Sequence, residues 1–430
     1  MSNTQAIINW QESIKEKVKI QNFIQEISEG KDFNKVINII GLKNITINII
    51  DKINSIANNS EFPLNMRLYL ALSDIIKRLE LNNTKYDSMY YEDKAYEVIR
   101  KNVIDTVKNS YSWDKNNSKF IQDNITIQLP VRVNFGGGPS DAAPYCIEHG
   151  GTMIDAALLL NGNKPIEVVV KKIEEDVIIF ESLDLNNKKV FSNLDELMEY
   201  SNPHDIFSLH KAVLVACGLI PVDINDTSLS DICNMIGGGL YLSTKVDVPK
   251  GSGLGTSSII SAACIKAIRE ILGQSTSDDI IYEQVFLAEQ LMTTGGGWQD
   301  QVGGLTPGVK FFYSHPGWKQ IINVEYLKMS KQFEKEFDER FALIFSGQQR
   351  LARNVLREEL NQFIRNDEVA MESIESIRQL CMDMKYQLYR GNITKFGQCL
   401  SKQFELFKKL DKGVSNTCIE YIFYVIISIY

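Results

Sequence analysis

A glycine-rich loop at residues 249–258 has the residue types and spacing of an anion-binding site. The loop consists of Pro249, Lys250, Gly251, Ser252, Gly253, Leu254, Gly255, Thr256, Ser257 and Ser258. Its three alternating glycines permit backbone angles and close approaches that a side chain would block. The hydroxyl residues that follow stand where a helix N-cap is expected, and the free N–H groups and dipole of a helix start attract anions. We expect the phosphate chain of a nucleotide to bind here; the alternative is a glycine-rich turn that caps a buried helix.

A second group of polar residues follows a strand predicted over 124–135. Arg132 and Asn134 share one face near the end of this strand, and a bend of three glycines at 136–138 then leads to Asp141. Charged groups that a strand end and a glycine turn present together are typical of the floor of a ligand pocket. The alternative is a hairpin with a solvated arginine and a solvated aspartate.

A third group follows a helix predicted over 280–294, which carries Glu289. Three glycines at 295–297 and then Trp298, a glutamine, Asp300 and another glutamine come next. The glycines would let the chain fold back, so that both carboxylates face one cavity. The alternatives are an exposed glutamate with a turn aspartate, and a buried turn tryptophan in place of one that stacks on a sugar.

Periodicity predicts the elements that position these groups. Alternation over 240–248 predicts a strand that leads into the loop, and the residues 259–272 continue from it as an apolar helix. Further strands are expected at 152–160, 166–172 and 177–182. Residues 308–313 and 320–324 are expected to form a hairpin, and residues 341–346 a buried strand. Further helices are expected within 1–120, especially at 64–81 and 95–107, at 208–217 and over 369–410, with a polar linker at 108–119. Two arginines at 350 and 353 either hold phosphate or are solvated.

Composition restricts the classes of protein to consider. The chain has 430 residues, 44% of them hydrophobic and 23% charged, as expected of a soluble globular protein with two or three domains. Its net charge of −8 argues against nucleic acid or an anionic membrane as the main partner. Seven scattered cysteines without a CxxC pair favour reduced thiols in the cytoplasm. We expect neither a signal peptide nor a membrane-spanning segment.

The motifs, in this order, resemble those of the GHMP kinase superfamily, which includes galacto-, homoserine and mevalonate kinases. PKGSGLGTSS is similar to its second motif, which wraps the ATP phosphates, and VRVNFGGGPSD to its first, which lines the substrate pocket. Three stretches resemble the L-fucokinase branch: RVNFGGGPSDAAPYCIEHGG, VPKGSGLGTSSI and LMTTGGGWQDQVGG. The resemblance implies an α+β fold with two lobes, an ATP-binding lobe at 121–325 and a C-terminal lobe at 326–430, behind a helical region at 1–120.

The resemblance also implies roles for single residues. Asp300 matches the residue that accepts the proton of the sugar hydroxyl, and Arg132 matches an arginine near the transferring phosphoryl group. Ser257 and Glu289 match the two side chains that bind Mg²⁺, and Asp141 matches the residue that hydrogen-bonds sugar hydroxyls. The implied substrate pocket is lined by Asn134, Gly137, Gly138, Asp141, Gly297 and Trp298.

The sequence departs from the family in two places. The third motif, a late glycine-rich run, is absent, and the tail YIFYVIISIY resembles the end of a truncated or frameshifted reading frame with an incomplete second lobe. The guanylyltransferase module that is fused to some fucokinases is also missing. The expected reaction is the ATP- and Mg²⁺-dependent phosphorylation of the anomeric hydroxyl of L-fucose. The alternatives are a heptose 7-phosphate kinase, a non-catalytic nucleotide- or sugar-binding remnant, and a helical interaction protein with a decayed kinase.

Overall fold

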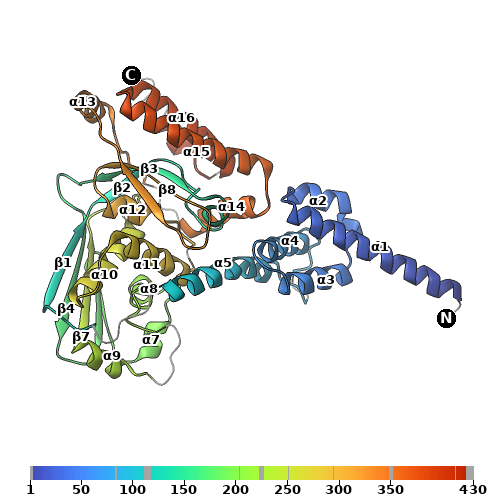
Figure 1. The fold of residues 1–430 in the computed structure, drawn as a ribbon, viewed down its shortest axis with the longest axis horizontal. Helices are drawn as coiled ribbons and strands as arrows, with labels where there is room; N and C mark the ends of the chain where they lie inside the picture. The colour runs from blue at the N-terminus through green and yellow to red at the C-terminus, as the bar shows by residue number, and fades with distance from the viewer. Residues whose placement is uncertain are drawn as a thin grey trace. The chain divides into compact units, whose positions relative to one another are not determined.

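A computed structural model describes most of the chain, and its backbone divides into two compact units (Figure 1). The first unit consists of Met1–Asn102 with Glu358–Ser373, and the second of Val103–Arg357 with Ile374–Tyr430. The described residues are 3–82, 85–110, 118–202, 204–221, 227–249, 251–293, 295–347, 352–411 and 413–422.

The first unit is helical, as the sequence predicts. Its helix α4 is almost entirely buried, and an ion pair of Arg365 with Asp74 joins it to the later segment, with Nε–Oδ2 and Nη2–Oδ1 distances of 2.7 and 2.8 Å. The helices are α1 (Asn3–Ser28), α2 (Phe33–Ile40), η1 (Leu42–Asn44), α3 (Ile47–Asn58), α4 (Leu64–Arg78), and parts of α5 (Ser88–Ser110) and α14 (Ala352–Ile364). The helices predicted at 64–81 and 95–107 are thereby confirmed.

A five-stranded sheet of order β1-β4-β7-β5-β6 forms one layer of the second unit. Adjacent strands of this sheet are antiparallel, except that β5 and β7 are parallel. Helices α10, α11 and α8 cover one face, with α10 packed against β1 and β4 (Figure 1). The elements of this layer are β1 (Asn124–Leu129), β4 (Ile166–Ile173), β5 (Ile178–Ser182), β6 (Asn187–Phe191), β7 (Gly239–Val246), α7 (Leu194–Met198), α8 (Ser208–Ala216), α9 (Leu229–Ile236), α10 (Thr256–Ile271) and α11 (Asp278–Leu291).

A four-stranded antiparallel sheet of order β2-β3-β8-β9 forms the second layer. Helix α12 packs on β2 and β3, while apolar side chains of β2, β3 and β8 form a core with α13, α15 and α16. Phe135 is central to this core and meets three other phenylalanine rings edge to face. The elements are β2 (Val131–Gly136), α6 (Tyr145–His149), β3 (Thr152–Leu158), α12 (Gln299–Leu305), β8 (Val309–Ser314), β9 (Ile322–Tyr326), α13 (Lys331–Arg340), α15 (Glu368–Tyr389) and α16 (Ile393–Leu410).

The strand predicted over 124–135 is two strands that belong to different sheets. It breaks at Pro130, because proline has no N–H group to donate to a sheet ladder. β1 pairs with β4 in the five-stranded sheet, and β2 pairs with β3 in the four-stranded sheet. Pro130 is therefore the point at which the chain passes from one layer to the other, two residues before Arg132.

The prediction of a buried strand over 341–346 is wrong. This segment has no regular structure, and Leu343, Ile344 and Phe345 are each about half exposed, at 53, 52 and 49%. No described strand pairs with it, and an extended segment without a partner cannot form a ladder. Of the arginine pair at 350 and 353, residue 350 and the side chain of residue 353 lie outside the described part of the structure. Among the described residues, no helix is long and apolar enough to cross a bilayer.

Candidate active site

The predicted phosphate-binding loop connects β7 to α10. Gly251, Gly253 and Gly255 all have positive φ, at 72, 75 and 74°, where an L side chain is strained. Gly255 is the N-cap of α10, and no described side chain caps the helix start. The N-cap thus precedes residues 256–258, where the sequence predicts it, and the first N–H groups of α10 are available to an anion.

One side chain of the loop also lacks a partner. The Ser252 hydroxyl group is buried and has no hydrogen-bond partner among the described residues. A buried polar group is normally hydrogen-bonded, so an unpaired one indicates that something else binds it. The loop residues therefore fit the phosphates of a nucleotide. Lys250, which the sequence also assigns to this loop, lies outside the described residues.

Arg132 on β2 joins this loop to Asp300 on α12. Its Nε donates a hydrogen bond to Asp300 Oδ1 at 2.8 Å, and its Nη2 forms an ion pair with the same oxygen. Its Nη1 donates a hydrogen bond to the Gly253 carbonyl at 3.1 Å, and its backbone N–H donates one to the Leu254 carbonyl at 3.3 Å. Burial alone would lower the pKa of Arg132, but the neighbouring carboxylates of Asp300 and Asp155 raise it. Two of the predicted site residues thus meet directly beside the loop.

Asp141 lies at the start of α12, next to Asp300. The backbone N–H of Gln299 donates to its Oδ2 at 3.0 Å, and the Gln299 side-chain amide to its Oδ1 at 3.3 Å. A Cβ on Gly297 would lie 2.0 Å from Asp141 Oδ2, so only glycine fits there. Burial raises the pKa of Asp141 to about 6, although the hydrogen bond from Gln299 opposes the rise.

Glu289 on α11 meets the N-terminal turn of α10. Its Oε1 accepts a hydrogen bond from Ser258 Oγ at 2.7 Å, and both residues are buried. The contact falls on Ser258, whereas Ser257, which the resemblance implies as a metal ligand, is exposed. A Cβ on Gly296 would lie only 2.9 Å from Glu289 Oε2, so the glycine run leaves space around the carboxylate. One hydroxyl and one carboxylate suit Mg²⁺ that is also bound by phosphates, and the residues present fit it.

The glycine turn after β2 is held from two sides. A Cβ on Gly137 (φ 107°) would lie 1.9 Å from the Thr152 carbonyl, while Gly138 lies beside the Gln299 amide. The Gln403 side chain on α16 accepts a hydrogen bond from the Gly137 N–H at 3.3 Å and donates one to the Phe135 carbonyl at 2.9 Å. The predicted substrate turn therefore has a fixed backbone beside Asp141.

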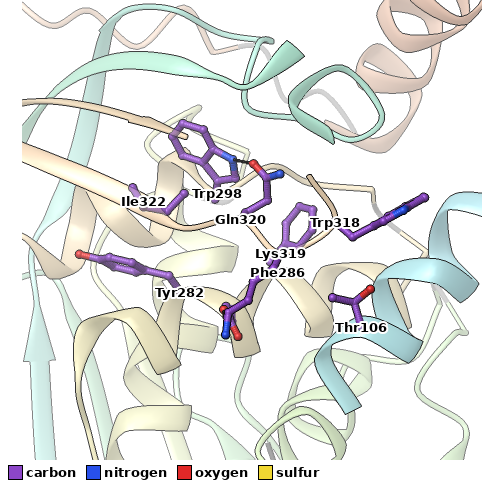
Figure 2. A pocket seen from close by; sticks show the side chains of 9 residues that line it. Thr106, Tyr282, Phe286, Trp298, Trp318, Lys319, Gln320 and Ile322 are labelled. Atoms are coloured by element: carbon purple, nitrogen blue, oxygen red, sulfur yellow. Dashed lines mark hydrogen bonds and ion pairs between the residues drawn. The ribbon is translucent and has the colours of Figure 1, made fainter. Parts of the chain in front are cut away.

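Trp298 faces the protein interior. Its side chain is fully buried, its Nε1 donates to Gln320 Oε1 at 3.1 Å, and its ring packs on Phe312. Figure 2 shows it at one wall of a small pocket, with Tyr282 and Phe286 of α11 opposite. Of the two alternatives for Trp298, the structure therefore shows the buried turn tryptophan. Its side chain lies beneath the turn between Gly297 and Asp300.

Comparison with known proteins identifies relatives of this chain. Residues 226–307, which include the phosphate loop and α12, match the family described as GHMP kinases N terminal domain. A Bacteroides fragilis protein described as L-fucokinase/L-fucose-1-P guanylyltransferase is 31% identical over 332 residues, which are 76% of this chain and 35% of that protein. The chain belongs to the GHMP kinase superfamily.

Within the superfamily, the sequence lies in the fucokinase branch, although the chain spans about a third of the length of that bifunctional relative. A D-glycero-alpha-D-manno-heptose 7-phosphate kinase of Campylobacter jejuni is 28% identical over 304 residues, which cover 70% of this chain and 81% of that protein. A crystal structure of a Listeria innocua protein aligns with a TM-score of 0.50 at 10% identity, over 68% of this chain and 80% of that one. The α+β fold expected of a GHMP kinase, with two sheets and many helices, is confirmed.

Several residues of this GHMP kinase site were not predicted. Gln299 stands inside the motif that carries Asp300, so its position next to a predicted carboxylate was a usable signal. Asp155 lies in the middle of a predicted strand, where a buried charge is unusual. Gln403 gives no local signal, because it is 266 residues away in sequence from the Gly137 N–H that it binds.

Proposed function

We propose that this chain is an ATP-dependent kinase that phosphorylates the anomeric hydroxyl group of L-fucose. The observation that carries the proposal is the Arg132–Asp300 ion pair, which lies against the phosphate loop and next to the buried Asp141. An activated hydroxyl and a stabilised phosphoryl group must meet at one point, and these three side chains supply a base, a cation and a sugar-binding acceptor there. The sugar is chosen because the Bacteroides fragilis relative is described as an L-fucokinase.

The chemistry requires positioning more than covalent catalysis. Asp141 and the fixed backbone of the substrate turn would hold the sugar hydroxyls, and Asp300 would accept the proton of the anomeric hydroxyl. The sugar oxygen then forms a bond to the γ-phosphorus of ATP while the bond to the oxygen that bridges to the β-phosphate breaks, and ADP leaves. Arg132 and the N–H groups at the start of α10 would stabilise the negative charge of the transferring group. Mg²⁺, held by Ser258 or Ser257 and by Glu289, would neutralise phosphate charge.

Phosphorylation of a heptose 7-phosphate is a second candidate, and the Campylobacter jejuni relative favours it. Such a substrate carries an additional phosphate group, which proteins usually bind with arginine or lysine. The Asp141 carboxylate accepts hydrogen bonds from neutral groups, which include the Gln299 backbone and amide, and the cation whose charge acts on it is Arg132, already paired with Asp300. This environment suits a neutral sugar better than a sugar phosphate.

Sugar-dependent release of ADP tests the proposal. The purified chain is incubated with ATP, Mg²⁺ and, in separate reactions, L-fucose, D-galactose, D-mannose or a heptose 7-phosphate, and the product is identified by ³¹P NMR. We expect release with L-fucose and a phosphate on the anomeric carbon. Release with the heptose alone would favour the second candidate. If no sugar gives ADP while calorimetry still detects ATP binding, the chain is a non-catalytic nucleotide-binding protein.

A further inference from the structure

A fully buried carboxylate, Asp155, lies behind Arg132 and has no role in the chemistry proposed above. It stands in the middle of β3, and its Oδ1 accepts a hydrogen bond from the Asn134 amide at 2.6 Å. Its Oδ2 lies 3.8 Å from Arg132 Nε and has no hydrogen-bond partner among the described residues. Arg132 Nε is therefore placed between two carboxylates, with Asp300 Oδ1 at 2.8 Å on the other side.

Lys310, on the adjacent strand β8, is the direct cross-strand neighbour of Asp155. Its ammonium group is also fully buried and donates to the carbonyls of Gly303, Thr306 and Gly308, at 2.5, 2.6 and 3.4 Å. Two of these carbonyls lie at the C-terminal end of α12, where a cation is favoured. Lys310 thus fixes the end of the short helix whose first turn carries Asp300.

The space between these groups is closed. A Cβ on Gly303 of α12 would lie 2.8 Å from Arg132 Cγ and 2.8 Å from Asp155 Oδ2. The backbone of α12 at Gly303 therefore packs directly against the Arg132 and Asp155 side chains. Two cations and two anions share this packed region, and removal of one buried charge leaves an unpaired one.

We propose that Asp155 is a positioning residue, which together with Lys310 holds the Arg132 guanidinium and the helix of Asp300 in the arrangement needed for phosphoryl transfer. The inference rests on the proposed function for its catalytic consequence, but the placement of Arg132 can be tested without turnover. Among the described residues, Asp155 hydrogen-bonds Asn134 of the implied substrate pocket, and it reaches the phosphate loop through Arg132.

The charges that face Asp155 support this arrangement. Burial raises the pKa of Asp155, while Arg132 and Lys310 lower it and Asp300 raises it again. Burial lowers the pKa of Lys310, and Asp155 opposes that change. The Cys381 thiol of α15 faces the same group, and its pKa is raised by burial and by Asp155. Arg132 and Lys310 therefore favour the ionised form of Asp155 against the effect of its burial.

Asp155→Asn tests the proposal, since it removes the charge and keeps the shape. Asp205→Asn is the control, because Asp205 also pairs with a buried cation, Lys211 Nζ at 2.6 Å, and accepts a hydrogen bond from the Phe207 N–H, and neither partner is a predicted site residue. We expect kcat to fall on the order of 100-fold in Asp155→Asn, with KM for sugar and ATP within about twofold, and to stay near wild type in the control. A kcat loss of equal size in both variants, or none in Asp155→Asn, would overturn the proposal.

The second readout is the Nε–H signal of Arg132 in ¹H–¹⁵N spectra, assigned with Arg132→Lys. We expect this signal to shift and to exchange faster with water in Asp155→Asn, and to remain unchanged in Asp205→Asn. An unchanged signal in Asp155→Asn refutes the inference. If the wild-type chain phosphorylates no sugar, the proposed function fails, and this signal alone decides whether Asp155 positions Arg132. If Asp155→Asn does not fold, Asn134→Ala, which removes a hydrogen bond and no charge, must change the same signal.

Discussion

Two glycines of the phosphate loop allow backbone strain to be separated from damage to the Arg132–Asp300 pair. Gly253 and Gly255 have nearly the same φ, 75 and 74°. A Cβ on Gly253 would meet nothing within 4 Å, whereas a Cβ on Gly255 would lie 2.9 Å from Asp300 Cγ and 3.1 Å from Arg132 Nε. Substitution of each glycine by alanine therefore imposes the same backbone strain, but only the change at position 255 pushes on the pair.

The size of both effects follows from these distances. A left-handed alanine costs about 1–2 kcal/mol, and each kcal/mol lowers Tm by about 2–4 °C in domains of roughly 150–250 residues and by no more than that in the larger second unit. Ordinary contact begins at 3.4 Å, so Asp300 must retreat by about 0.5 Å from a new Cβ at position 255. A displacement of about 1 Å can cost on the order of 100-fold in rate, so we expect roughly a tenfold loss of kcat in Gly255→Ala beyond that in Gly253→Ala.

The assay measures ADP release at saturating ATP and sugar, with melting curves of both variants recorded in the same buffer. We expect equal falls in Tm and unequal falls in kcat. Equal kcat in the two variants would show that the contact between position 255 and Asp300 does not govern turnover. A larger fall in Tm for Gly255→Ala than for Gly253→Ala would show that the loop backbone is displaced by the new side chain instead of Asp300.

Three further predictions concern the same site. Asp300→Asn removes the proposed base, so kcat should fall to background while the Kd for ATP from calorimetry stays near wild type; normal turnover would exclude the role. Glu289→Gln weakens a metal ligand, so the Mg²⁺ concentration for half-maximal rate should rise about tenfold or more, and an unchanged titration would remove Glu289 from the metal site. Since the pKa of Asp141 is raised to about 6, its acceptor carboxylate is lost below that pH, and KM for the sugar should rise about tenfold between pH 7 and pH 5. A flat KM profile would argue against Asp141 as the acceptor.

Local patterns in the sequence predicted those parts of the site that are formed by residues adjacent in sequence. The loop before α10 and the glycine runs beside Asp141 and Glu289 are rich in glycine. Closely spaced glycines indicate tight turns and close backbone approaches, so these segments could be recognised from the sequence. Most strands, and the helices α4, α8, α10 and α11, were predicted to within a few residues, because their apolar periodicity reports burial directly. The segment 341–346 shows the limit of that signal, since apolar character indicates a strand only where a neighbouring strand is present to pair with it.

Contacts between distant segments could not be predicted. Nothing near Pro130 shows that the residues on its two sides join different sheets, because that depends on where β4 and β3 lie. The choice of Ser258 as the partner of Glu289 depends on the rotation of α10 about its axis, which a motif does not specify. The charges of Asp155 and Lys310 become a pair only through the register of two strands.

The hydrogen bonds of Gln403 set an order of events during synthesis. The ribosome makes the substrate turn at 136–138 long before it makes Gln403, which is separated from Gly137 by 266 residues. At about 5–20 residues per second, the nascent turn waits roughly 13–53 seconds for the side chain that fixes its backbone. The loop at 249–258 and helix α12 emerge within that interval. The substrate turn, which we propose binds the sugar, is therefore fixed after the phosphate loop has been made. A chain released before residue 403 would carry the phosphate loop but would lack the side chain that fixes this turn.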